Sequence, residues 1–281
     1  MSMPVGMPTT VDEAVEMLAC NREARVLAGG TDYMVEVNYG LADPRCVVSL
    51  RAVDELRTWR REGSCLVLGA GITFADLRDA PLAGLAPALA QAARTVGSPQ
   101  IRNTGTLGGN LATASPAGDS LPVLMALDAR VCLASAAGRR VVPIGQFITG
   151  VKRTTLVPGE IILSITIPVA TGPQEFLKVG RRNAMVIAIA SLALIVDIPA
   201  RQVACALGSV GPTIIRCRQA EALVAAAVDW ERLRIDDPLT YDEFSLLCAQ
   251  VARPIDDHRA TAAYRRHTIS VLARRALMRA L

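Results

Sequence analysis

Hydrophobic and polar positions in the first 170 residues predict short strands interleaved with helices. A Thr-x-x-Glu capping box begins at Thr10, and Ala14, Val15 and Leu18 follow it with the spacing of one apolar helix face. This pattern predicts a helix that begins after Thr10. The other elements predicted in this part are strands at 25–28, 46–50, 66–69, 130–133, 139–142 and 161–167, and helices at 73–77 and 85–96.

The last third of the chain has a different order, in which strand-like segments come before helix-like ones. This order favours a sheet with helices on one face. A polar link at 170–174 separates this part from the first, and 281 residues suffice for two domains at about 150 residues each. The predicted strands are 175–180, 184–196 and 202–207, and the predicted helices are 219–228, 241–251 and 259–281.

The segment 97–119 is rich in Gly, Ser, Thr, Asn and Pro and shows almost no apolar periodicity. A loop of this length inside a compact domain is unusual unless it has a function. It contains Thr104-Gly-Thr-Leu-Gly-Gly-Asn110. A second motif with adjacent glycines, Ala28-Gly-Gly-Thr-Asp32, ends the predicted strand at 25–28.

Adjacent glycines allow a ligand to approach the main chain, and consecutive N–H groups form a nest that attracts anions. Each glycine pair alone is typical of an ordinary turn. The two pairs together favour a phosphate-bearing ligand gripped from two sides. Neither motif matches a common nucleotide signature. Elsewhere in the chain, Gly69-Ala-Gly71 lacks the third glycine of GxGxxG, and no GxxxxGK[ST] occurs. The residues therefore indicate a class of ligand without naming it.

Composition and charge narrow the function classes. Hydrophobic residues make up 51% of the chain and aromatic residues 4%, so aliphatic side chains must fill the cores. The net charge of +4 is not concentrated in one block, and we expect no nucleic-acid binding. Acidic residues interrupt any N-terminal apolar region, and the longest apolar run, 184–196, is shorter than the ~20 residues that span a bilayer. The sequence predicts a soluble, cytoplasmic protein.

The cysteines and histidines do not predict a metal site. Seven cysteines occur, but the closest two, Cys205 and Cys217, are twelve residues apart, so no CxxC pair exists. Their odd number and unpaired spacing fit free thiols in a reducing compartment. The two histidines, His258 and His267, lie in the last helical stretch. We expect no metal ligands and no His-dependent catalytic triad in this chain.

Longer motifs surround the glycine pairs and continue to the end of the chain. They are Val26-Leu-Ala-Gly-Gly-Thr-Asp32, Leu68-Gly-Ala-Gly71, Gly97-Ser-Pro-Gln-Ile-Arg-Asn-Thr-Gly-Thr-Leu-Gly-Gly-Asn110, Ala114-Ser-Pro-Ala-Gly-Asp119, Gly159-Glu-Ile-Ile-Leu-Ser-Ile-Thr-Ile-Pro168, Phe176-Leu-Lys-Val-Gly-Arg-Arg182, Asp256-Asp-His-Arg259 and Tyr264-Arg-Arg266. In this order they resemble the medium, FAD-binding subunit of molybdenum hydroxylases, the family of bacterial xanthine and carbon monoxide dehydrogenases. The resemblance covers nearly the whole chain.

The resemblance implies an α+β, vanillyl-alcohol-oxidase/PCMH-type FAD-binding fold of two subdomains, at about 1–55 and 56–170. It implies a C-terminal domain at 175–281 with a three-stranded antiparallel sheet and helices. By matching position it implies an FAD site made of Leu27, Ala28, Gly29, Gly30, Thr31, Asp32, Tyr33, Val96, Thr106, Leu107, Gly108, Gly109, Asn110, Ser115, Asp119, Ile162 and Lys178.

Two of these residues have an alternative interpretation. Lys178 is placed near the flavin by the resemblance, but a solvated strand lysine has the same sequence signal. Ile162 is expected to approach the flavin, to pack in a core, or to do both. One departure from the family pattern is Met185, followed by Val186, where many relatives carry an acidic residue. It leaves the flavin-edge contacts and the electron acceptor open.

The resemblance also implies partners. A large subunit carries the molybdenum cofactor and oxidises the substrate, and a small subunit carries two [2Fe–2S] clusters. FAD in this chain passes the electrons to an external acceptor such as NAD or a quinone, so no catalytic acid or base is expected in this chain. A free-standing flavin-dependent oxidase and a non-redox nucleotide-binding protein are the alternatives. This sequence does not predict the substrate, because the substrate pocket would lie in another chain.

Overall fold

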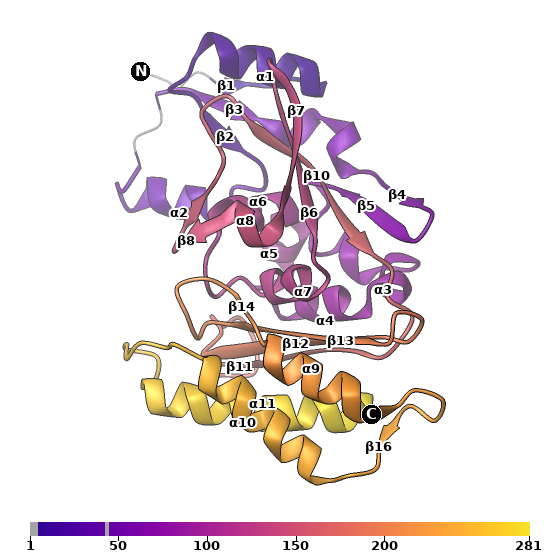
Figure 1. Ribbon diagram of the computed structural model, residues 1–281. Helices are drawn as coiled ribbons and strands as arrows, with labels where there is room; N and C mark the ends of the chain where they lie inside the picture. The colour runs from indigo at the N-terminus through magenta and orange to yellow at the C-terminus, as the bar shows by residue number, and fades with distance from the viewer. Residues whose placement is uncertain (1–4, 43–44) are drawn as a thin grey trace. The chain divides into compact units, whose positions relative to one another are not determined.

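The computed structural model describes residues 5–42 and 45–281, divided between two units (Figure 1). Unit 1 consists of the described residues of Met1–Asp76, Pro99–Ala114 and Ala129–Pro168. Unit 2 consists of Leu77–Ser98, Ser115–Asp128 and Val169–Leu281. The chain therefore passes between the units repeatedly, and each unit is assembled from segments that are distant in sequence.

Strands are the main elements of unit 1. They are β1 (Val5–Gly6), β2 (Arg25–Leu27), β3 (Val47–Ser49), β4 (Trp59–Glu62), β5 (Cys65–Gly69), β6 (Arg130–Ser135), β7 (Gly138–Pro143), β8 (Ile148–Gly150), β9 (Arg153–Thr154) and β10 (Ile161–Pro168). A parallel sheet has the order β1-β3-β2, and an antiparallel sheet has the order β4-β5-β10-β6-β7. β8 and β9 form a separate hairpin.

Short helices connect the strands of unit 1. They are α1 (Val11–Cys20), α2 (Tyr33–Asn38), η1 (Leu50–Ala52), η2 (Asp54–Arg57), α5 (Pro99–Thr104), α6 (Leu107–Thr113) and α8 (Ile144–Phe147). The predicted capping box is confirmed, since Thr10 Oγ1 accepts the N–H of Glu13 at 3.1 Å and the Glu13 carboxylate reaches back to Thr9. The apolar face of α1, from Val11 to Leu18, is buried and packs against β3 and β6.

Unit 2 is built on one antiparallel sheet of order β11-β12-β13-β14. Its strands are β11 (Gln174–Val179), β12 (Ala190–Asp197), β13 (Gln202–Gly208) and β14 (Ile215–Arg216), with a small hairpin of β15 (Val228–Asp229) and β16 (Arg234–Ile235). Its helices are α3 (Leu82–Leu85), α4 (Pro87–Thr95), α7 (Ser120–Ala126), α9 (Arg218–Ala227), α10 (Leu239–Val251) and α11 (Ala262–Ala280), and η3 (Asp76–Arg78) lies where the chain enters the unit.

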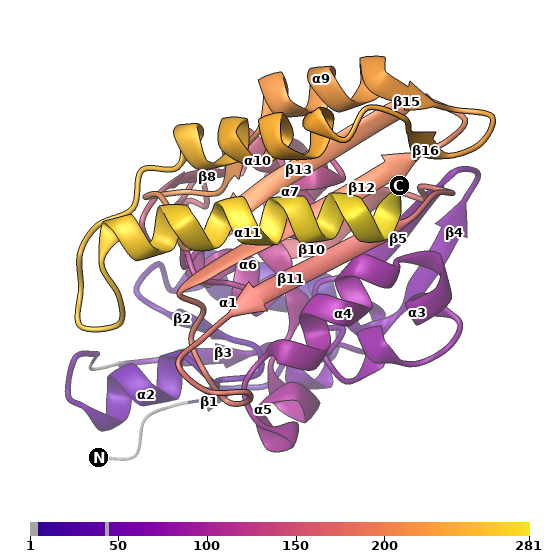
Figure 2. The same ribbon diagram turned by 90° about the horizontal axis from the view of Figure 1, so that it is seen from below.

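Helices cover both faces of this sheet. α9, α10 and α11 lie along one face (Figure 2), and α4 and α7 contact the sheet from the other side (Figure 1). The prediction of helices on one face only is therefore wrong. The helices of the second face come from earlier parts of the sequence, which the strand-then-helix order of the last third does not contain. Among the helices of the described residues, none combines the length and apolar character needed to cross a membrane.

Most predicted elements are present within a few residues of their predicted bounds, and three differences are informative. The C-terminal sheet has a fourth strand, β14, whose two residues are too few to show alternation. β12 begins at Ala190 and not at 184, because 184–189 is irregular, with Met185 at φ 49°. The segment 97–119, predicted as a loop, contains α5 and α6. Their Gly, Thr and Asn residues are poor helix formers, so the sequence signal for these helices is weak.

Candidate cofactor site

The first glycine turn links β2 to α2 in unit 1 and packs closely on another segment. A Cβ atom at Gly29 would lie 1.9 Å from the carbonyl oxygen of Thr104. Gly30 follows with φ 70°, in the left-handed region that favours glycine. Both positions therefore require glycine, the first for close approach and the second for its backbone conformation.

This turn has main-chain donors without an internal partner. The N–H groups of Gly29, Gly30, Thr31 and Asp32 donate to no other group within residues 5–42 and 45–281. Thr31 and Asp32 are exposed and the glycines are half-buried, so an outside ligand can reach the turn. Consecutive free amides attract an anion. The turn fits a phosphate group by this criterion.

The second glycine pair has a different role. Gly108 donates its N–H to the carbonyl of Ala70 at 2.8 Å, and Gly109 donates to Oγ1 of Thr106, the N-cap of α6, at 3.0 Å. A Cβ at Gly108 would lie 2.6 Å from that of Ala70. The prediction of two amide nests is therefore wrong for this pair, because Gly108 allows close packing and both amides are used internally.

The structure nevertheless brings the two motifs together within unit 1. A Cβ at Gly109 would lie 4.0 Å from Cβ of Ala28, and Oγ1 of Thr113 donates to the Asp32 carboxylate at 3.2 Å. The start of α6 therefore lies beside the free amides of the first turn. Leu107 is buried, Asn110 is half-buried on α6, and Tyr33 is half-buried at the start of α2.

The Thr106 cap gives a first testable prediction. Thr106→Ala removes the acceptor of the Gly109 N–H, and we expect the free energy of unfolding to fall by about 1 kcal/mol. Urea unfolding of the full chain measures this change. Thr106→Ser keeps the hydroxyl and should stay near wild type. An alanine variant as stable as the serine variant would contradict the assigned cap.

A buried ion pair and a neighbouring threonine connect the three segments of unit 2. Lys178 Nζ lies 2.5 Å from Oδ2 of Asp119, and Thr95 Oγ1 donates to the same oxygen at 2.9 Å. Lys178 Nζ also donates to the Thr95 carbonyl at 3.1 Å. The two charged side chains are only 7% and 5% exposed, so the interpretation of Lys178 as a solvated strand lysine is wrong.

The other oxygen of Asp119, Oδ1, is buried without a hydrogen-bond partner among the residues that the structure describes. Burial raises the pKa of this carboxyl above its ordinary value, although the charge of Lys178 and hydrogen bonds from Lys178 and Thr95 act in the opposite direction. A buried acceptor without a partner is costly, because it has lost water and gained nothing in return. Asp119 therefore has an unused acceptor that suits a ligand hydroxyl.

The remaining predicted residues have mixed surroundings. Val96 ends α4 next to Thr95, near the ion pair, and is half-buried. Ser115 is half-buried and its hydroxyl accepts the N–H of Ala117 at 3.3 Å. Ile162 is 6% exposed on β10, beside a β-bulge, and Leu27 is the last residue of β2. Core packing thus describes Ile162 in the structure, and its contact with a cofactor stays a prediction.

Comparison with known proteins places both parts of this chain in described families. Residues 2–170 match the family described as the FAD binding domain in molybdopterin dehydrogenase. Residues 175–280 match the family described as the CO dehydrogenase flavoprotein C-terminal domain. The chain belongs to the FAD-binding subunits of the molybdenum hydroxylases. It is thus a flavoprotein subunit of an oxidoreductase. The match of residues 2–170 shows its FAD-binding domain.

Relatives of this flavoprotein subunit match it over most of their length. The nicotinate dehydrogenase FAD-subunit of Eubacterium barkeri is 32% identical over 84% of this chain and 84% of its own. The glyceraldehyde dehydrogenase medium chain of Sulfolobus acidocaldarius is 30% identical over 95% of this chain and 94% of its own. A carbon monoxide dehydrogenase structure from Hydrogenophaga pseudoflava matches with a TM-score of 0.89 and 29% identity, over 100% of this chain and 97% of that one.

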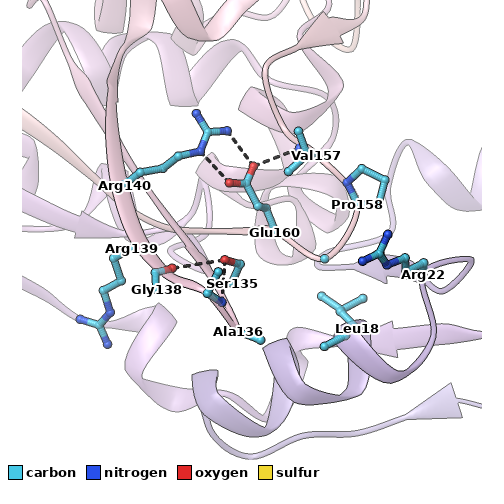
Figure 3. Close-up of a pocket in the computed structure, with 13 residues that line it drawn as sticks. Leu18, Arg22, Ser135, Ala136, Gly138, Arg139, Arg140, Val157, Pro158 and Glu160 are labelled. Atoms are coloured by element: carbon cyan, nitrogen blue, oxygen red, sulfur yellow. Dashed lines mark hydrogen bonds and ion pairs between the residues drawn. The ribbon is translucent and has the colours of Figure 1, made fainter.

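A surface pocket of about 460 Å³ lies elsewhere in unit 1 of the flavoprotein subunit (Figure 3). It is lined by the end of α1, the β6–β7 hairpin and residues 157–160, and no predicted cofactor residue lines it. Arg140 and Glu160 form an ion pair of 2.6 Å at its edge, and the hydrogen bond from Arg140 lowers the pKa of Glu160. The pocket is therefore not the predicted FAD site.

One group in unit 2 was not predicted from the sequence. Cys205, Cys217 and Cys248 come from β13, the residue before α9, and α10, and their sulfur atoms lie within 4.8 Å of one another. Separations of twelve and thirty-one residues show no ligand motif in the sequence. The fold, and not the local spacing, brings these thiols together.

Proposed function

We propose that this chain is the electron-transfer subunit of a cytoplasmic, heterotrimeric molybdenum hydroxylase. It would receive electrons from two [2Fe–2S] clusters in a small subunit and deliver them to an external acceptor, while a large subunit with the molybdenum cofactor oxidises the substrate. The names of the relatives support this division, since they are FAD-subunits and medium chains of dehydrogenases. We also propose a PCMH-type FAD-binding domain at 1–170, with subdomains at about 1–55 and 56–170, and a C-terminal domain at 175–281.

The free amides of Gly29 to Asp32 are the observation that carries the assignment of the FAD site. FAD offers a diphosphate, which accepts hydrogen bonds, and hydroxyl groups, which donate them. The free amides of unit 1 match the diphosphate. Taken by itself, the unpartnered Oδ1 of Asp119 in unit 2 suits a hydroxyl donor. Lys178 and Thr95 hold Oδ2 of Asp119 and so orient the carboxylate.

When bound, the isoalloxazine supplies the redox chemistry, and the protein supplies binding, orientation and electrostatics. The main-chain donors of Gly29 to Asp32 would hold the diphosphate, and Lys178 stays paired with Asp119. No proton transfer to a substrate is assigned to them. We propose that Val96, Ile162 and the start of α6 complete the apolar and main-chain contacts to the cofactor.

Asn110→Asp tests the proposed phosphate environment. The change places a carboxylate on α6 beside the first glycine turn, where it would repel a diphosphate. We therefore expect less FAD per purified chain than in wild type, measured from flavin absorbance after release. Asn103→Asp, an equal change at an exposed position of α5, is the matched control and should keep the wild-type content. Equal flavin content in both variants would count against the site.

Purification of the native complex tests the function itself. We expect two other subunits, molybdenum and iron to co-elute with this chain, and its flavin to be reduced when the substrate of the complex is added. A chain that turns over a substrate without partner subunits would instead be a free-standing flavin oxidase. A chain that binds a nucleotide but neither retains nor takes up flavin would be a non-redox nucleotide-binding protein.

A further inference from the structure

Three cysteine thiols meet inside the core of unit 2, in the layer between the sheet and its C-terminal helices. Sγ of Cys205 on β13 lies 3.9 Å from Sγ of Cys248 on α10, and Sγ of Cys217 lies within 4.8 Å of both. All three side chains are at most 1% exposed, and they are surrounded by residues such as Val224 and Phe244. The FAD assignment uses none of them.

The main chain around the thiols is fixed by hydrogen bonds. Cys217 donates its N–H to the carbonyl of Cys205 at 2.9 Å. The N–H of Cys205 donates to Oε1 of Glu221 at 2.8 Å, and Glu221 is held by Arg216 at 2.6 Å. Two of the three sulfur-bearing residues are therefore positioned by a buried polar network. These bonds fix the main chain from which the two sulfur atoms project.

The spacing of the sulfur atoms is close to that of a three-thiolate metal site. Metal–sulfur bonds of about 2.3 Å in a trigonal arrangement place the sulfur atoms about 4 Å apart. The distance from Cys205 to Cys248 already has this value, and the outer limit of 4.8 Å requires a contraction below 1 Å. Buried cysteines often pack simply as small apolar side chains, but that role does not require three of them to converge.

We propose that Cys205, Cys217 and Cys248 form a binding site for one soft divalent metal ion of the Zn²⁺ and Cd²⁺ class. Thiolate sulfur favours soft ions over hard ones such as Mg²⁺ and Ca²⁺. Charge favours a divalent ion, because three thiolates and a divalent ion leave a net charge of −1, and a monovalent ion would leave −2 in an apolar core. Binding releases the three thiol protons and involves no redox step.

Cadmium binding to the full-length chain tests the site. The reduced chain is incubated with Cd²⁺, passed over a gel-filtration column in the presence of a competing chelator, and analysed for metal and for the thiolate-to-cadmium absorption band. We expect one retained Cd²⁺ per chain. Cys217→Ala and Cys248→Ala should each lose the retained ion, whereas Cys20→Ala, at an exposed thiol of unit 1, should keep it. Wild type without retained cadmium, or Cys217→Ala with the full amount, overturns the proposal.

X-ray absorption at the cadmium edge of the wild-type chain gives a test that needs no substitution in the core. The melting transition of each variant shows whether it folds. Where a core variant does not fold, the absorption measurement on the wild-type chain still decides the question. Three sulfur neighbours per cadmium ion are expected. Fewer than three sulfur neighbours, or a shell dominated by oxygen or nitrogen, contradicts the site.

Discussion

Lys178→Met is expected to lower the free energy of unfolding by about 3–5 kcal/mol, because it leaves the carboxylate of Asp119 buried without its partner charge. Urea unfolding at neutral pH measures the loss. The deficit should shrink as the pH falls. Burial has already raised the pKa of Asp119, and removing Lys178 raises it further, so acid neutralises the unpaired carboxylate in the folded chain before it does so in the unfolded one.

The double variant Lys178→Met/Asp119→Asn is the control for this prediction. Without the buried charge, most of the lost stability should return, although the amide still needs its own hydrogen bonds. Comparison of both single variants, Lys178→Met and Asp119→Asn, with the double variant separates the charge interaction from the loss of the long lysine side chain. A single Lys178→Met variant within about 0.5 kcal/mol of wild type would show that this pair is not a buried ion pair in solution.

Gly29→Ala is the second change with a large expected effect. The added Cβ would overlap the Thr104 carbonyl oxygen at 1.9 Å, and neither main-chain segment can yield without moving the turn. Overpacking of this kind costs about 1–3 kcal/mol, and displacement of the free amides should remove most of the bound FAD. Unfolding and flavin content are measured on the same preparation.

Gly84→Ala is the matched control for this second change. Gly84 has open space at its Cβ position and an ordinary helical backbone, so the same added methyl group should leave both stability and flavin content close to wild type. A Gly29→Ala chain that carries as much FAD as Gly84→Ala would show that the geometry of the first turn does not determine cofactor binding.

Local sequence signals predicted the elements that depend on local interactions. The capping box at Thr10, most strands of the two larger sheets and the three C-terminal helices follow from capping and apolar spacing, whereas β4 and β14 were not predicted. α6 has a Thr cap but weak helix formers, and its helix is held by contacts such as that of Gly108 with Ala70, which no local pattern records. The second helical face of the unit 2 sheet was missed for another reason, because α4 and α7 come from segments that precede the last third of the chain.

The features of the candidate site also divide into those that local sequence predicted and those that depend on the fold. The exposed turn at Gly29-Gly30 was predicted from the glycines themselves, and its free amides agree with that prediction. The amides of Gly108 and Gly109 were wrongly assigned, since a glycine required for packing and one required for binding look alike in sequence. The ion pair of Lys178 with Asp119 joins residues 59 positions apart, and the three-cysteine cluster joins three elements. Neither could be predicted without knowledge of the fold.

The most direct test of the FAD site is the response of individual glycine amides to the cofactor. The full chain is labelled with ¹⁵N-glycine, freed of flavin and titrated with FAD, and the ¹H–¹⁵N resonances are assigned with single-glycine variants. We predict large shifts for Gly29 and Gly30, whose N–H groups become bonded to the diphosphate, and smaller shifts for Gly108 and Gly109, whose N–H groups are already bonded. FAD that binds while Gly29 and Gly30 stay unchanged would contradict the account.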